Sequence, residues 1–345
     1  MNVPGSTQGS ATETEDLAAA LAGDEEAFRR LTETFTRELH VHCYRVLGSF
    51  QDADDALQET LLRAWRHLAS FEGRSSFRAW LYRIATNVCL TGTARRRVEP
   101  SPLPAALATA VATSTEPIIY LSPYPDALLD ELEAPWGNPV AQYDLHESVQ
   151  VAFLAAVQLL PPRQRAVLLL RDVLGWSARE VAELLDSTTA SVNSALQHAR
   201  ATIDQQRTEG RLHTGRTVPA NEIERSLVHR FVEAWDAVDL DRLAGLLKSD
   251  AVLTMLPVPL RYEGRRAVVE FFATVPAGGA LNQLRLIATR ANRQPALAVY
   301  RRDSTGITYR AFSLLVLTLD GDAIAEITAF HEPTPMPRFG LPTEL

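Results

Sequence analysis

The chain has 345 residues, a formal net charge of −8 and two cysteines. That length exceeds one ordinary domain and allows two or three with proper cores, and two cysteines exclude a disulfide framework. A negative chain is a poor general binder of DNA, yet the charge is unevenly placed. Residues 24–97 hold twelve Arg against ten acidic residues, whereas residues 98–160 hold eight acidic residues and no Lys or Arg. The acidity is therefore concentrated in a linker.

The N-terminal part predicts a helical bundle. Residues 1–15 are rich in Ser, Thr, Gly and Glu and are expected to be disordered. Residues 16–97 then carry apolar side chains at spacings of three and four, which indicates helices. The segment Asp52-Ala-Asp-Asp-Ala-Leu-Gln-Glu-Thr-Leu-Leu-Arg-Ala-Trp65 places polar groups on one side of a helix, with Leu57, Leu61 and Leu62 facing inward. A plain surface helix would show the same charge pattern.

A second segment of this part carries aromatic and basic residues. It reads Phe71-Glu-Gly-Arg-Ser-Ser-Phe-Arg-Ala-Trp-Leu-Tyr-Arg-Ile-Ala-Thr-Asn87, and a run of three Arg follows at 95–97. Aromatic faces and Arg side chains hold unstacked bases and displaced strands. Phe77, Trp80 and Ile84 also have the spacing of core residues, and for Trp80 a core position is the better interpretation. The stronger DNA candidates are Arg74, Ser75, Arg83 and Asn87.

In this order the two segments closely resemble the second conserved region of sigma-70-family factors of the extracytoplasmic-function class (group IV). The resemblance implies that the first segment binds the clamp of the largest RNA polymerase subunit, through Asp52, Asp54, Asp55, Gln58, Glu59, Leu62 and Trp65. It also implies that the second segment opens the −10 promoter element, through Arg74, Ser75, Phe77, Trp80, Arg83, Asn87, Arg95, Arg96 and Arg97. The three terminal Arg would meet phosphates without reading sequence.

Residues 98–143 are expected to form an acidic, Pro-rich linker, because eight prolines between 98 and 139 prevent long regular elements. Within it, Ile118-Ile-Tyr-Leu-Ser-Pro-Tyr124 is apolar and aromatic, so we expect it to dock on another part of the protein. Residues 144–207 predict short helices with tight turns, as a helix-turn-helix requires. Ser177 and Glu180 have the spacing of a capping box.

The stretch Leu160 to Leu185 is similar to the fourth conserved region of the same family, which contacts the polymerase flap and the −35 element. The helix expected over Thr189–Ile203 would then be the recognition helix. Its base-reading candidates are Thr188, Thr189, Ser191, Asn193, Ser194, Gln197 and Arg200. The chain departs from the family pattern, since relatives commonly have Gly in the turn and basic residues early in the recognition helix. In this chain such positions are occupied by Asp186, Asn193, Ala195 and His198. The expected electrostatic attraction between this helix and DNA is therefore weaker.

After a short linker at 208–218, residues 219–332 predict helices followed by an antiparallel sheet, an α+β domain. It resembles the SnoaL-like branch of the nuclear-transport-factor-2-like fold, a curled, cone-shaped sheet. The ionisable residues near its strands are best interpreted as solvated or strand-end groups, namely Asp250, Glu263, Glu326 and His331. A Pro-rich tail over 333–345 is expected to be extended. This added domain marks the sigma-G-like subclass, related to the sigma-J-like proteins, in which it acts as a regulator.

The fold class expected is therefore multidomain, with two all-α helical modules and one α+β SnoaL-like domain. The resemblance implies a cytoplasmic sigma factor that binds core RNA polymerase and promoter DNA, without catalytic residues, cofactor or membrane span. His40, His42 and Cys43 lack a second cluster, so no metal site is expected. The alternative is an enzyme or ligand sensor with an attached DNA-binding module. An interior filled by Phe271, Phe272, Leu315 and Leu317 would oppose it, and a possible small apolar ligand stays open. A plain helix-turn-helix repressor would not need the first module.

Overall fold

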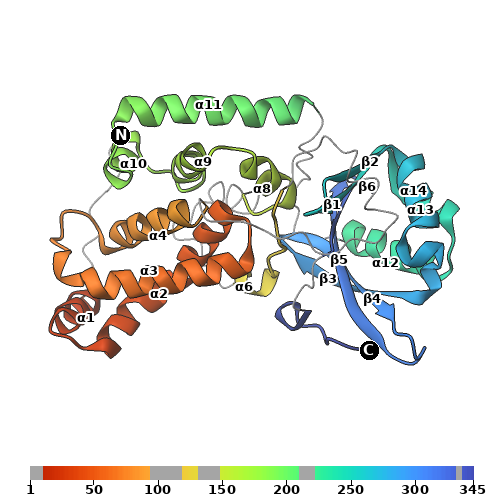
Figure 1. Ribbon diagram of the computed structural model, residues 1–345, viewed down its shortest axis with the longest axis horizontal. Coiled ribbons are helices and arrows are strands. Elements are labelled where there is room, and N and C mark those ends of the chain that lie inside the picture. Colours follow the sequence, from red (N-terminus) through yellow and green to blue (C-terminus); the bar gives the residue numbers. More distant parts are fainter. Residues whose placement is uncertain (1–10, 94–118, 131–147, 210–221, 332–335) are drawn as a thin grey trace. The chain divides into compact units, whose positions relative to one another are not determined.

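A computed structural model describes residues 11–93, 119–130, 148–209, 222–331 and 336–345 (Figure 1). The chain divides into two compact units. The first comprises Met1–Arg97 with Leu160–Ala201, and the second comprises Val98–Leu159 with Thr202–Leu345. Within the described ranges, no helix is both long enough and apolar enough to cross a membrane.

The first unit is helical. Its bundle contains α1 (Ala11–Leu21), α2 (Glu25–Leu47), α3 (Phe50–His67), a 3₁₀ turn (Leu68–Ser70) and α4 (Phe77–Thr93). The remaining helices are α9 (Pro162–Leu168), a π-helical turn (Leu169–Val173), α10 (Ala178–Leu184) and α11 (Thr189–Thr208), of which the part from Thr202 onwards is assigned to the second unit. The disorder expected for 1–15 is wrong for 11–15, because α1 begins at Ala11.

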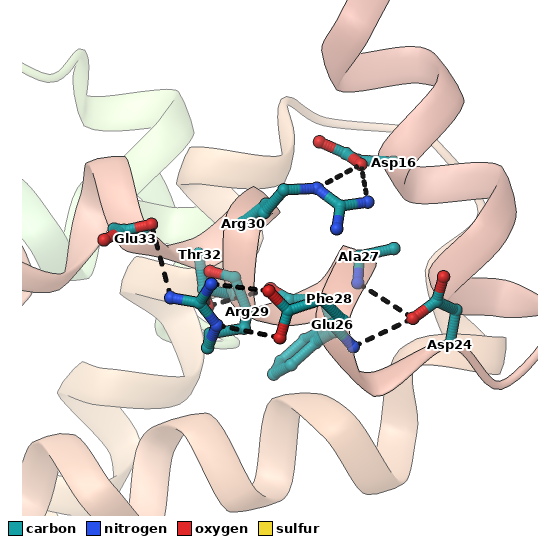
Figure 2. Close-up of polar contacts among 9 residues, drawn as sticks. All are labelled: Asp16, Asp24, Glu26, Ala27, Phe28, Arg29, Arg30, Thr32 and Glu33. Atoms are coloured by element: carbon teal, nitrogen blue, oxygen red, sulfur yellow. Dashed lines mark hydrogen bonds and ion pairs between the residues drawn. The ribbon is translucent and has the colours of Figure 1, made fainter.

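Figure 2 shows how α2 begins and how it is tied to α1. Asp24 Oδ1 accepts the backbone N–H groups of Glu26 and Ala27, which caps the helix. Arg30 donates to Asp16 of α1 through two nitrogens at 3.0 and 2.6 Å. This ion pair and the buried side chain of Ala20 join α1 to the helical unit.

The core of this unit is formed by aromatic and aliphatic side chains of α2 and α4. Leu39, Tyr44, Leu81 and Tyr82 are almost completely buried. Arg165 of α9 donates to the carbonyl oxygen of Val46 at 2.6 Å, so the second helical module packs directly on the first. The ring of Tyr82 also lies 5.3 Å from that of Trp176, centroid to centroid.

The second unit contains a six-stranded sheet. Its strands are β1 (Leu247–Leu256), β2 (Leu260–Glu263), β3 (Leu284–Ala291), β4 (Gln294–Arg302), β5 (Tyr309–Asp320) and β6 (Ala323–Phe330). The order is β2-β1-β6-β5-β4-β3, with only β1 and β6 parallel among neighbours. The sequence did not indicate β2, a four-residue edge strand too short for a visible alternation.

One face of the sheet is covered by three helices, α12 (Glu222–Asp236), α13 (Leu240–Leu246) and α14 (Arg265–Thr274), as Figure 1 shows. Between them and the strands lies a closely packed hydrophobic core that includes Phe271, Phe272, Leu315 and Leu317. The interior of the domain is therefore filled by side chains. This is the arrangement expected to oppose an enzymatic pocket.

The opposite face is buried as well. Along β4, seven consecutive residues from Gln294 to Tyr300 are buried, so both faces of this strand are covered. Helix α8 (Val151–Gln158) lies on this second face, where Val151 and Ala152 share a small cavity with Thr254 and Thr328 of the sheet. The first helix of the predicted second helical module, residues 144–207, thus belongs to the second unit.

The docking predicted for the aromatic linker segment is confirmed over 119–124, whereas residue 118 lies outside the described ranges. Tyr124 is completely buried, and its N–H donates to Asn292 Oδ1 at 2.8 Å. The short helix α6 (Asp126–Asp130) follows. The extended tail is only partly confirmed, because Met336–Phe339 form a 3₁₀ turn while Glu344 pairs with Arg310 beside β5.

Candidate nucleic-acid and polymerase interface

Helix α3 exposes one continuous stripe. Ser49 caps it by accepting the N–H of Asp52 at 3.2 Å, and Ala53, Leu57 and Thr60 are among its buried residues. The stripe that faces outward consists of Gln51, Asp55, Gln58, Leu62 and Arg66. The inward orientation predicted for Leu62 is wrong, since this side chain is 43% exposed.

The other residues predicted to bind polymerase are half-buried and make contacts within the bundle. Asp54 Oδ1 lies 3.0 Å from His40 Nε2 of α2, and Glu59 accepts from Arg63 at 2.6 Å. The Trp65 ring packs 5.1 Å from Phe28. Asp52 is also half-buried at the first turn. Asp54 and Trp65 therefore hold α3 against α2. The side chains of Asp55, Gln58 and Leu62 are exposed to solvent.

A hollow of about 530 Å³ lies between the end of α3 and the face of α4. Its lining includes five residues predicted to bind the −10 element, namely Arg74, Ser75, Trp80, Arg83 and Asn87. Gly73 makes the preceding turn at a φ of 68°, and Ser76 Oγ accepts the N–H of Ala79 at the start of α4. The hollow combines an aromatic face, guanidinium groups and an amide, which are the groups that bind an unstacked base.

Two predicted members of this group lie elsewhere. Phe77 is buried, with its ring 5.5 Å from Phe71 and 5.6 Å from Trp80, so it supports the hollow from beneath. The run at 95–97 lies outside the described residues. Conversely, Arg63 and His67 also line the hollow. Sequence reasoning missed them because they come from α3, although their spacing of four places them on one helix face.

The helix-turn-helix forms as predicted, and the capping box at its start is confirmed. Ser177 Oγ accepts the N–H of Glu180 at 3.2 Å, while Glu180 Oε2 accepts the N–H of Ser177 at 2.7 Å. The hydrogen bond from Ser177 lowers the pKa of Glu180, so the carboxylate stays ionised at the helix N-terminus. This capped helix, α10, positions the turn that leads into α11.

The recognition helix exposes every side chain predicted to face DNA. Val192, Leu196, Ala199 and Ile203 are buried, and the seven candidates from Thr188 to Arg200 lie on the exposed side. Two of them already have local partners. Thr188 Oγ1 accepts the N–H of Ser191, and Arg200 makes two bonds to Asp172 at 2.9 and 2.7 Å. Arg200 therefore joins α11 to the π-helical turn Leu169–Val173.

The turn of this motif contacts the hollow of the first module. Asp186 adopts a left-handed conformation with a φ of 47°, and its Oδ1 accepts from Arg83 at 2.7 Å. Arg83 lines the hollow, so the turn before α11 is joined by an ion pair to a residue of the predicted −10 site.

The ionisable residues of the third domain do not form one cluster. Asp250 and Glu263 are exposed, and His331 is half-buried with its ring against Phe312. Glu326 is buried and accepts from Thr254 Oγ1 at 3.2 Å, on the sheet face opposite the filled interior. Within the described ranges, no group of three or more His, Cys, Asp or Glu side chains is placed to hold a metal ion.

Comparison with protein families identifies these parts. Sigma-70 region 2 matches residues 31–98, Sigma-70 region 4 matches residues 150–203, and a SnoaL-like domain matches residues 228–327. The crystal structure of the extracytoplasmic-function sigma factor SigJ of Mycobacterium tuberculosis aligns with a TM-score of 0.56. That alignment covers 93% of this chain and all of the other at 19% identity, which indicates a shared fold. The fold and its two helical surfaces thus define a sigma-70-type transcription factor.

The sequence relatives show to which subgroup of this class the chain belongs. SigG of Mycobacterium tuberculosis is 40% identical over 322 residues, which cover 92% of this chain and 85% of the relative. SigM of the same organism is 30% identical over 204 residues, 59% of this chain and 88% of the relative. The chain belongs to the extracytoplasmic-function RNA polymerase sigma factors. It is a promoter-directing sigma factor with a C-terminal SnoaL-like domain, and proteins of this family bind core RNA polymerase and promoter DNA.

Proposed function

We propose a division of labour among the surfaces of this sigma factor. The stripe of α3 around Gln58 binds the clamp of the largest polymerase subunit, the hollow on α4 receives a base of the opened −10 element, and α11 reads the −35 element. The second helical module also meets the flap of the second-largest subunit. The observation that carries the proposal is the convergence of Arg74, Ser75, Trp80, Arg83 and Asn87 on one hollow. Such work on polymerase and DNA requires no catalysis by the chain and takes place in the cytoplasm.

Run-off transcription with purified core polymerase on genomic fragments tests this assignment. We expect Arg83→Ala and Asn87→Ala to reduce promoter-specific transcripts at least tenfold, because each removes a group that lines the hollow. Arg29→Ala is the matched control (Figure 2). Arg29 is an exposed residue of the same module, paired with Glu26 and Glu33 and absent from the lining. Equal transcription by all three variants would refute the role of the hollow.

We further propose that the structure is a restrained state. The −10 and −35 elements lie about 25 base pairs apart, or roughly 85 Å at 3.4 Å per base pair. Here the turn before α11 touches Arg83 of the hollow, so one compact unit holds the two DNA-binding surfaces together. Both elements cannot be engaged in this arrangement. Binding to a promoter therefore requires the modules to separate.

The SnoaL-like domain contributes to the restraint by holding the linker. Asn292, at the tip of the β3–β4 hairpin, accepts from the Tyr124 N–H and donates to the Val149 carbonyl oxygen at 2.7 Å. Tyr124 and Val149 are 25 residues apart, a length that would reach up to roughly 85 Å when extended. By holding Tyr124 and Val149 on one side chain, the domain shortens the reach of the chain between the two helical modules. The C-terminal domain is thus proposed as an intramolecular regulator.

A further inference from the structure

The hairpin between β4 and β5 lies at the end of the sheet where the C-terminal residues pair with it (Figure 1). Its turn, residues 303–308, is fixed by Asp303. The Asp303 carboxylate accepts the N–H groups of Thr305 and Gly306, both at 3.0 Å, while its own N–H donates to the Thr308 carbonyl oxygen at 2.8 Å. This ordered turn displays Ile307, which at 83% is the most exposed large hydrophobic side chain of the described residues.

Four arginines surround this tip. Strand pairing places Arg301 opposite Arg310 and Arg302 opposite Tyr309. Neighbouring residues of a strand point to opposite faces, so both faces of the hairpin carry guanidinium groups. The guanidinium of Arg285, from β3, and that of Arg302 both lie over the Tyr309 ring, at 4.5 and 5.6 Å from its centroid. The aromatic ring therefore holds two of the cations in place.

Three of these positive charges have no carboxylate partner within the described ranges. Arg310 pairs with Glu344 at 3.3 Å, whereas the interactions of the other three guanidinium groups are with aromatic rings. An aromatic face orients a guanidinium but does not neutralise it. The charge of Arg301 acts on its surroundings, since burial and this charge together lower the pKa of His331.

The acidic groups at this end of the sheet are engaged within the fold. The Asp303 carboxylate accepts from the turn, and Glu344 pairs with Arg310. The main-chain oxygen of Leu345 accepts the Tyr309 N–H at 3.1 Å. The end of the hairpin is therefore a basic surface in a protein whose net charge is −8.

Phosphates are suitable partners for such a surface, because the planar guanidinium binds phosphate oxygens in pairs. A flat lipid surface would meet only one face of the hairpin. Duplex DNA instead offers grooves between two rows of phosphates, and DNA-binding proteins insert apolar side chains such as Ile there. Cations on both faces of the hairpin can then reach both rows.

We propose that the β4–β5 hairpin of the SnoaL-like domain binds duplex DNA, in addition to the surfaces proposed on α4 and α11. The guanidinium groups of Arg285, Arg301 and Arg302 bind phosphates, and the side chain of Ile307 enters a groove. Phosphate contacts carry no sequence information. The hairpin therefore adds affinity for DNA without selecting a promoter.

Salt dependence measures these phosphate contacts, because each contact releases bound counterions. The probe is a labelled duplex that carries neither promoter element, so the result is independent of the roles proposed for α4 and α11. Fluorescence anisotropy gives the affinity of the full-length protein over a range of salt concentrations. The hairpin variant combines Arg285→Gln, Arg301→Gln and Arg302→Gln. Its control removes the same charge from exposed arginines on the helices of the domain, through Arg230→Gln, Arg242→Gln and Arg266→Gln.

We expect the hairpin variant to bind the duplex at least tenfold more weakly at low salt. The slope of log affinity against log salt should become shallower by roughly 2–3, since each lost phosphate contact removes about 0.9. The control should keep the wild-type slope, and both variants should keep the wild-type thermal midpoint. Equal slopes in the hairpin variant and its control would refute the phosphate contacts.

Ile307→Ser tests the tip separately. We expect at least threefold weaker duplex binding with an unchanged salt slope, because the lost contact is apolar. Ile223→Ser, at another exposed position of the domain, should bind as the wild type does. Wild-type affinity in Ile307→Ser would exclude insertion of the tip.

Two other polyanions decide whether the partner is DNA. Phosphatidylglycerol vesicles present phosphates on a flat surface, and polyglutamate presents carboxylates without a groove. Both should bind the full-length protein at least tenfold more weakly than the duplex. Absence of saturable duplex binding, or equal binding of either polyanion, would overturn the proposal.

Discussion

The guanidinium of Arg83 lies 2.7 Å from a carboxylate oxygen of Asp186, across the two helical modules of one compact unit. Both side chains are substantially exposed, at 47% and 73%. An exposed ion pair of this kind contributes about 0–1 kcal/mol and weakens with salt. The contact therefore holds the modules together only lightly, as a reversible restraint requires.

Asp186→Gly tests this contact. Glycine accepts the left-handed backbone at this position without the steric cost of a side chain, so the turn itself should keep or gain stability. Loss of the pair should raise the affinity of the hollow for single-stranded −10 DNA up to about fivefold at low salt, measured by fluorescence anisotropy. Glu183→Gln, which removes a similar exposed partner from Arg179, is the control. Equal affinities for wild type and Asp186→Gly would contradict the restraint.

Asn292→Gly tests the linker clip, by which we mean the two hydrogen bonds that hold Tyr124 and Val149 on the Asn292 side chain. Asn292 and Arg293 have positive φ values of 57° and 61°, so glycine at 292 preserves the hairpin turn. The substitution leaves the buried Tyr124 N–H and Val149 carbonyl without the Asn292 side chain, at a cost of about 1–3 kcal/mol each. We expect faster hydrogen exchange at Tyr124 and more run-off transcript per sigma factor. Asn282→Gly, at an exposed position, should change neither. Faster exchange with unchanged transcription would refute regulation by the clip.

The exposed stripe on α3 is predicted to bind core polymerase, and substitution of Leu62 tests this. Leu62→Asp should leave the unfolding free energy nearly unchanged, because this side chain is 43% exposed, yet reduce affinity for core polymerase at least tenfold. Leu57→Ala is the contrasting variant. Leu57 is only 9% exposed, so its truncation should cost about 2–5 kcal/mol of stability. Chemical denaturation and binding to labelled core enzyme separate the two effects. Full polymerase affinity in Leu62→Asp would exclude this stripe as the docking surface.

Sequence reasoning predicted the residues that line the hollow better than it predicted the contacts between the two helical modules. The chemistry of their side chains identified Arg83 and Asn87 as candidates, and a spacing of four residues places them on one helix face. The contact of Arg83 with Asp186 joins residues 103 positions apart, and no local pattern encodes such a pairing. The sequence showed Asp186 only as an unusual residue in a turn.

The same limit explains why the partner of the linker segment and the orientation of Leu62 were missed. The apolar linker segment around Tyr124 was expected to dock, but its receptor, the Asn292 side chain, lies 168 residues away. Leu62 was assigned inward because two adjacent leucines fit a helical stripe equally well. The bundle accommodates Leu61 as a half-buried residue and leaves Leu62 outside, which only the packing of α2 on α3 decides.

The buried His42 makes the stability of the first unit depend on pH. Thr86 Oγ1 donates to the Tyr82 carbonyl oxygen, so His42 Nε2 carries the proton that it shares with Thr86 Oγ1 at 2.9 Å. Burial, together with the charges of Arg45 and Arg78, lowers the pKa of His42 to about 3 from a usual value near 6.5.

Between these two values the unfolded chain binds a proton at this histidine and the folded chain does not. The free energy of unfolding should therefore fall as the pH decreases from about 6.5 towards 3, by up to about 1.4 kcal/mol per pH unit and roughly 5 kcal/mol in total. His42→Gln keeps a hydrogen-bonding side chain but cannot titrate, so urea denaturation should lose this part of the slope. His67→Gln, at an exposed position, is the control and should retain it. An identical pH slope in His42→Gln and wild type would show that the acid sensitivity comes from other groups.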